Sequence, residues 1–206
     1  FEVYEELRAA GIDWLTTGDH IWKNRDFLPY LDRSDIQVLR PANYSGAPGR
    51  GMVSIEVGAQ MVTVANLMGT VFMNVHVDNP FTTVDRIINE SKGFLLIDFH
   101  AEATSEKNTL GHYVDGRAGA LLGTHTHVQT ADERILPKGT AYISDAGMCG
   151  PLDGSIGVAI SSVLPNFLHG MPGKHESAEG PRQLCGVVLT VAEGRAVAIE
   201  RVRRTL

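Results

Sequence analysis

The amino-acid sequence predicts a single α/β domain in which buried strands alternate with helices. Residues 94–99 form an almost uninterrupted apolar run, which is typical of a strand buried on both faces of a sheet. Amphipathic or polar segments of helical character flank that run, at 82–91 and from 101 towards Tyr113. With 206 residues, 43% of them hydrophobic and 20% charged, the chain has an ordinary globular composition and is long enough for one sizeable core.

The first third of the chain predicts half of a strand–helix–strand unit followed by a hairpin. Residues 1–10 are amphipathic and end at Gly11, which is suited to close a helix. A strand should follow and run into a polar loop that contains a glycine. The expected elements are a helix at 1–10, a strand at 12–17, a short helix at 23–31, a Pro/Gly-rich loop at 40–51, and hairpin strands at 52–57 and 60–67.

The remaining chain predicts further strands, each ending in polar or glycine-rich residues. Thr82 or Thr83 is expected to cap the helix that ends before Gly93. The expected elements are a helix at 82–91, a strand at 94–99, a polar helix from 101 towards 113, strands at 118–122 and 140–145, a loop or mobile flap at 155–181, and a terminal hairpin at 184–191 and 195–202.

Charge and composition exclude several classes of partner. The net charge is −6, and the only basic cluster is Arg201, Arg203 and Arg204, so a polymeric nucleic acid is not expected as a partner. No apolar run approaches the ~20 residues that span a bilayer, and no leader-like segment opens the chain, so we expect a cytoplasmic protein without membrane contact. Cys149 and Cys185 fit no metal or disulfide pattern and are expected to be small buried residues.

Histidines recur at the ends of three predicted strands. Asp19 and His20 follow the first strand, His100 follows the buried strand, and His125 and His127 follow the next. Functional side chains collect at the carboxyl ends of strands in α/β folds. Alternation along an extended segment would place His125 and His127 on one side. Imidazole and carboxylate groups are ligands for Zn, Mn or Fe, so the pattern predicts a divalent-metal site.

Other kinds of site explain this pattern less well. Neither cysteine lies in a nucleophile motif, and the sequence contains no GxSxG or P-loop motif. A network of hydrogen-bonded core histidines could account for any one of these residues. It accounts poorly for four histidines and an aspartate at three strand ends.

Several long segments resemble the YmdB-like branch of the calcineurin-type metallophosphoesterases, and together they cover nearly the whole chain except the loop near 155–181. These segments are Gly18–His20, Arg40–Asn43, Asp98–Lys107, Gly123–Asp132, Ile135–Tyr142 and Gly147–Met148.

The resemblance implies a two-sheet metallophosphoesterase sandwich flanked by helices (α/β/β/α) and a binuclear centre of Mn, Fe or Zn. Asp19, His100 and His125 would bind one metal and His127 the other, while His20 would be the catalytic residue. In the family a metal-bridging hydroxide attacks phosphorus while this histidine protonates or stabilises the leaving oxygen. The implied substrates are small phosphodiesters, including 2′,3′-cyclic nucleotides.

Two departures from the family pattern qualify these expectations. Asp19 stands where the family has asparagine, so a carboxylate replaces an amide donor beside the phosphate. An early aspartate and a Glu-Asn pair of the family have no counterpart ahead of the first helix. We therefore expect residues 1–206 to be one metallophosphoesterase domain that lacks its N-terminal part and first strands, binds one metal weakly and turns over slowly.

Two alternatives stay open at this point. One is a relative of the capsule-biosynthesis branch of the same superfamily, although segment 98–107 argues against it. The other is a degenerate metal-binding module, with a regulatory or interaction role and no turnover. A homo-oligomer is compatible with the sequence.

Overall fold

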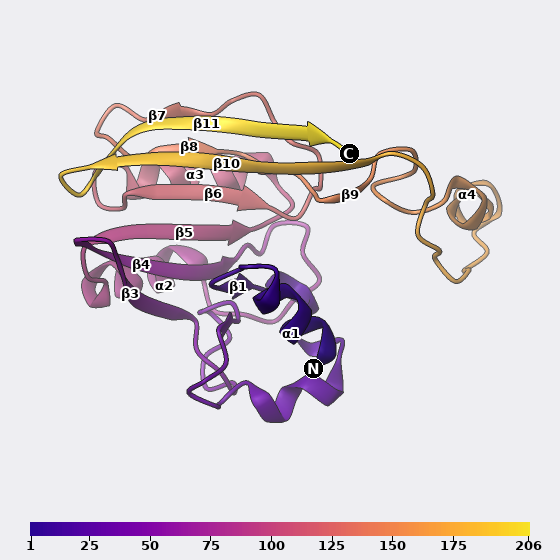
Figure 1. The fold of residues 1–206 in the computed structure, drawn as a ribbon, viewed down its shortest axis with the longest axis horizontal. Helices are drawn as coiled ribbons and strands as arrows, with labels where there is room; N and C mark the ends of the chain where they lie inside the picture. Colours follow the sequence, from indigo (N-terminus) through magenta and orange to yellow (C-terminus); the bar gives the residue numbers. More distant parts are fainter.

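A computed structural model describes all residues 1–206 and shows the α/β architecture (Figure 1). The α-helices are α1 (Glu2–Ala9), α2 (Pro80–Glu90), α3 (Thr104–Val114) and α4 (Ile160–His169), with 3₁₀ helices η1 (Gly18–Trp22) and η2 (Arg25–Tyr30). The strands are β1 (Leu15–Thr16), β2 (Val38–Leu39), β3 (Met52–Val57), β4 (Gln60–Met68), β5 (Phe94–His100), β6 (Ala120–Thr124), β7 (Arg134–Ile135), β8 (Ala141–Ile143), β9 (Gly150–Pro151), β10 (Arg182–Ala192) and β11 (Arg195–Thr205). None of the helices is both long and apolar enough to cross a membrane.

The centre of the fold is a six-stranded sheet in the order β3-β4-β5-β6-β8-β7. Strands β4, β5, β6 and β8 are parallel, so their carboxyl ends meet at one edge. Helices α2 and α3 cover one face, where Val84 and Leu110 pack with Ile97 and Leu121 in the largest buried cluster. This apolar layer fixes the strands whose ends carry the polar residues.

A second sheet covers the other face. Strands β10 and β11 form a long antiparallel hairpin, to which β9 adds a short third strand. Ala196 of β11 is buried against Phe94, Ala120 and Ala141 of the central sheet, with Leu189 packed beside them. Figure 1 shows this hairpin, in orange and yellow, lying along β6 and β8. The expected two-sheet architecture is therefore confirmed.

The alternation of side chains on β4, β5 and β6 brings polar groups to one face. On β5, Leu95, Ile97 and Phe99 point towards the helices, while Phe94 belongs to the cluster under the second sheet. Even-numbered residues of β5 therefore share a face. Asn66 pairs in register with Asp98, and His100 pairs with Thr124, which places four polar residues next to one another: Asn66, Asp98, His100 and Thr124.

Several predicted elements differ in extent from the observed ones. Only Leu15–Thr16 of the strand expected at 12–17 is extended, and it pairs with β2, which the sequence did not predict. The helix expected at 23–31 is 3₁₀, and so is the expected loop at 18–22. The hairpins β3/β4 and β10/β11 are confirmed.

Two local predictions were wrong. The cap of α2 is Asn79 instead of Thr82 or Thr83, because Pro80 can begin the helix and the Asn79 side chain accepts hydrogen bonds from the backbone N–H groups of Phe81 and Thr82. Segment 155–181 contains the helix α4 (Ile160–His169), which is capped by Gly170 in the left-handed conformation. No residue of α4 is buried, so this helix has no core-facing apolar stripe by which the sequence could reveal it.

A buried ion pair joins α3 to the edge of the sheet where the strands end. Lys107 Nζ lies 3.1 Å from Asp145 Oδ2, and both side chains are 2% exposed. The same oxygen accepts hydrogen bonds from the backbone N–H and the hydroxyl of Thr126, at 2.9 and 2.7 Å. Asp145 therefore holds the loop that contains His125 and His127.

We expect Lys107→Ala to lower the free energy of unfolding by about 3–5 kcal/mol, because it leaves the Asp145 carboxylate buried without its cation. Urea unfolding of the variant measures this loss. Lys174→Ala is the matched control, since Lys174 is exposed and makes no ion pair, and it should change stability by less than ~0.5 kcal/mol. An unchanged midpoint in Lys107→Ala would contradict the role of the pair.

Candidate metal centre

Three of the predicted ligands converge at the carboxyl ends of the parallel strands. Asp19 comes from η1, His100 from the end of β5, and His125 from the loop after β6. His100 Nε2 lies 3.0 Å from Asp19 Oδ1 and 3.0 Å from His125 Nδ1. One donor atom from each residue lies within 4.8 Å of the other two. The sequence-predicted trio is therefore a single cluster.

Gly18 allows Asp19 to approach His100 this closely. A Cβ at Gly18 would lie 2.5 Å from atoms of the His100 ring, and its φ of +63° favours glycine. The Gly18 N–H donates to Asn66 Oδ1 at 3.2 Å, which ties η1 to β4. The glycine of the Gly18-Asp19-His20 segment thus serves close packing against the imidazole.

The hydrogen bonds of His100 define which of its nitrogens is free. Thr124 Oγ1 donates its proton to Asp98 Oδ1 at 2.7 Å, so it can only accept from His100 Nδ1, which lies 3.0 Å away. Asp98 is held in turn by Asn66 Nδ2 at 3.1 Å. The proton of neutral His100 is therefore on Nδ1, and Nε2 presents a lone pair to Asp19 and His125.

Glu102 plays the same part for His125. Its Oε2 lies 3.1 Å from His125 Nε2, and the carboxylate attracts the ring proton to that nitrogen. His125 Nδ1 is then left with its lone pair facing His100 Nε2. His125 has φ of 103°, a strained conformation for a residue with a side chain, and such strain gathers at functional sites.

This arrangement fits a divalent cation. The lone pairs of two imidazole nitrogens and a carboxylate oxygen face one another, and neither nitrogen carries a proton there. These electron-rich atoms repel one another, and a bound cation would remove that repulsion. Nitrogen and oxygen donors of this kind suit Zn, Mn or Fe. The chain offers one such group of three donors.

The ionisation of the trio agrees with this geometry. Burial, together with nearby His125, lowers the pKa of His100 to about 4, so its imidazole is neutral near pH 7. Burial alone would raise the pKa of Asp19, but the neighbouring imidazoles of His20, His100 and His125 lower it overall, so this carboxyl group is ionised. Neutral imidazoles and an ionised carboxylate are the forms that bind metals.

His20, the predicted catalytic residue, lies at the open side of the cluster. Its Nε2 is 3.6 Å from Asp19 Oδ1, and its side chain is 59% exposed. Lys23 Nζ lies 2.6 Å from the same nitrogen. The histidine is thus accessible to a small molecule that contacts the cluster, and a cation stands beside it.

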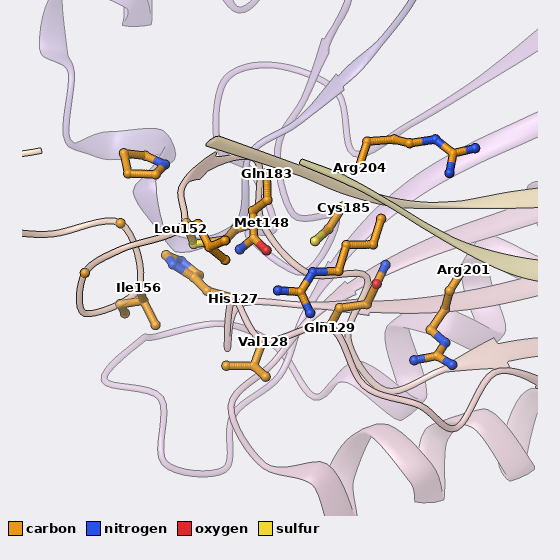
Figure 2. A pocket seen from close by; sticks show the side chains of 14 residues that line it. His127, Val128, Gln129, Met148, Leu152, Ile156, Gln183, Cys185, Arg201 and Arg204 are labelled. Carbon is orange, nitrogen blue, oxygen red and sulfur yellow. The ribbon is translucent and has the colours of Figure 1, made fainter. Parts of the chain in front are cut away.

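His127 does not join the trio. The expectation that His125 and His127 share a face was wrong in its premise, because β6 ends at Thr124 and both histidines have positive φ, 103° and 70°. His127 instead lines a neighbouring cavity of about 570 Å³. Figure 2 shows its side chain among those that line this cavity. Its role as a ligand of a second metal remains a proposal based on resemblance.

The supporting residues were not identified from the sequence. Thr124, Asp98 and Lys23 have no ligand-like spacing, and Glu102 is an ordinary acidic residue of a loop. The alternation of side chains along the strands could have identified some of them, because Asp98, His100 and Thr124 fall on one face of the sheet once β5 and β6 are paired in register. Cys185 was also misplaced, because it is only partly buried and lines the same cavity as His127, while Cys149 is exposed.

We expect Thr124→Val to weaken metal binding by about 10- to 100-fold, because His100 Nδ1 loses its acceptor and its ring is no longer held. Titration calorimetry with Mn²⁺ and Zn²⁺ measures the change. Thr190→Val, at an exposed position of β10, makes the same substitution away from the site and should leave affinity unaltered. Equal affinities in the two variants would refute the positioning role of Thr124.

Stability of the metal-free protein should fall as the pH drops from about 6.5 to 4. The folded protein keeps His100 neutral down to about pH 4, while the unfolded chain takes up the proton near pH 6.5, so protonation favours unfolding in that window. The shift corresponds to about 3 kcal/mol. Urea unfolding in EDTA at several pH values tests this, and in His100→Gln the slope across the window should shrink. An undiminished slope in that variant would assign the effect to other groups.

Comparison with known proteins agrees with the fold. A protein family described as "YmdB-like protein" matches residues 1–202. A 2′,3′-cyclic-nucleotide 2′-phosphodiesterase of Bacillus subtilis (strain 168) is 43% identical over 208 residues, which cover 98% of this chain and 78% of that protein.

Two solved structures share the fold along the whole chain. A hypothetical protein of Thermus thermophilus superposes with a TM-score of 0.94 at 41% identity, covering 99% of this chain and 81% of that one. A structure described as a novel phosphatase of Mycoplasma pneumoniae has a TM-score of 0.91 at 35% identity, covering 100% of this chain and 76% of that one. On the match over residues 1–202 and these likenesses, the chain belongs to the YmdB-like protein family.

Proposed function

We propose that this protein is a metal-dependent phosphodiesterase that hydrolyses cyclic nucleotides, with 2′,3′-cyclic phosphodiesters as the first candidates. The observation that carries the proposal is the convergence of three lone-pair donors, from Asp19, His100 and His125, at one edge of the sheet. The Bacillus subtilis relative, which is named for this activity and is 43% identical, supports the choice of substrate.

The trio would hold one divalent ion, of Mn, Fe or Zn. A bound divalent ion activates water and neutralises charge on phosphoryl oxygens. Thr124 and Glu102 orient the two imidazoles towards the ion. A second ion would involve His127 together with donors outside the trio.

His20 is the proposed general acid. Its exposed imidazole lies beside Asp19 and is free of the buried network, so a substrate oxygen can reach it. Lys23 Nζ donates to His20 Nε2 at 2.6 Å, so it adds positive charge beside His20, and this nitrogen carries a proton only when that hydrogen bond opens. That cation offsets part of the negative charge that Asp19 brings to a site for an anionic substrate.

The test separates metal binding from turnover. We expect His20→Ala to keep its metal and to lose about 10²- to 10⁴-fold in kcat, because only the proton donor is removed. His100→Ala should lose the metal itself. Metal content after loading with Mn²⁺, and hydrolysis of bis(p-nitrophenyl) phosphate and adenosine 2′,3′-cyclic phosphate, give the two readouts.

His112→Ala is the control, since His112 is an exposed residue of α3. Full activity in His20→Ala would remove His20 from the mechanism. A metal-loaded wild-type protein that hydrolyses neither compound would refute the phosphodiesterase proposal and favour a metal-binding module.

A further inference from the structure

The cavity beside His127 is cationic in a protein that is acidic as a whole. Its volume is about 570 Å³, within the range of small-molecule sites. Three arginines line it and no Asp or Glu does, although the chain has a net charge of −6. Arg201 is paired with Glu133 at 2.6 Å, whereas Arg203 and Arg204 make no ion pair. Because Arg203 and Arg204 are neighbours on β11 and Arg203 is paired with cavity-lining Cys185, the guanidinium group of Arg203 is the one available to an anion.

The hairpin β10/β11 positions these arginines relative to His127. Arg203 lies opposite Cys185 in the strand register, and both residues line the cavity. Gln129, two residues after His127, donates from Nε2 to the carbonyls of Ala146, Gly186 and Val202 at 3.0–3.1 Å. These bonds tie the histidine loop to both hairpin strands, so the distance between His127 and the arginines is fixed by the fold.

The cavity has an apolar end and a cationic end. Figure 2 shows Ile156 on one side of His127 and Arg201 on the other. Leu152 and Ile156 come from the segment after β9, while the arginines come from β11. A ligand that fits both ends has a flat apolar group at one end and a negative charge at the other. Nucleotides have this character.

We propose that this cavity is a subsite for a second phosphoryl group of the nucleotide substrate, with Arg203 as its principal contact. The inference rests on the proposed phosphodiesterase function, in which the reacting phosphate lies at the metal trio. A cyclic nucleotide that also carries a 5′-phosphate then places that group against Arg203, whose planar fork suits phosphate oxygens. The preferred substrates are cyclic nucleotides phosphorylated at a second position.

The kinetic test compares adenosine 2′,3′-cyclic phosphate with the same compound phosphorylated at the 5′ position. We expect wild-type kcat/KM to favour the 5′-phosphorylated compound by about tenfold, the gain of one charge-assisted contact. Arg203→Ala should abolish that preference. Arg195→Ala, which removes the same charge at the far end of β11, should keep it. A wild-type ratio near one, or an unchanged ratio in Arg203→Ala, would overturn the subsite.

A binding measurement separates failure of this inference from failure of the proposed function. Titration calorimetry on the metal-free full chain compares adenosine 3′,5′-bisphosphate with adenosine. Wild-type protein should bind the bisphosphate about tenfold more tightly than Arg203→Ala does, even if neither cyclic compound is hydrolysed. Equal binding in the two proteins would reject the subsite, whereas hydrolysis without any 5′-phosphate preference would reject it and leave the phosphodiesterase standing.

Discussion

The buried ion pair of Lys107 and Asp145 is the interaction on which the site depends. It joins α3 to the residue after β8, and Asp145 also receives the backbone N–H and hydroxyl of Thr126. Thr126 lies between two histidines in left-handed conformations, which cost roughly 1–3 kcal/mol each. The hydrogen bonds to Asp145 supply the constraint that keeps this loop in its strained form, so a charge pair remote from the ligand atoms decides where His125 points.

The hydrogen-bond partners of His100 and His125 keep the ring protons on the nitrogens that point away from the centre of the trio. His100 Nδ1 donates to Thr124 Oγ1, which in turn donates to Asp98, and Glu102 attracts the Nε2 proton of His125. The two imidazoles would therefore use different nitrogens to hold an ion, Nε2 of His100 from β5 and Nδ1 of His125 from a loop. The hydrogen-bond partners of each imidazole decide which of its nitrogens keeps the proton, so the ligand nitrogens are already defined in the protein without an ion.

The sequence predicted the buried elements better than the exposed ones. The apolar run of β5 was predicted because burial on both faces leaves a continuous hydrophobic signal, and His100 at its end was found for the same reason. Asp19, His100 and His125 come together as predicted: the ends of parallel β5 and β6 meet at one edge, and η1 brings Asp19 to them. His127 could not be placed, because its direction depends on a left-handed backbone that no periodicity reports. Helix α4 was missed because none of its residues is buried.

The residues of the trio lie far apart in the sequence. Asp19 and His100 are separated by 81 positions, and they meet only when β4, β5 and β6 are in register and η1 is docked through Gly18. An unfolded chain cannot present these donors together, so an ion that binds them binds the native state alone. If the trio holds an ion as proposed, metal concentration enters the folding equilibrium directly, and a supply of the ion shifts the protein towards its folded population before any substrate is met.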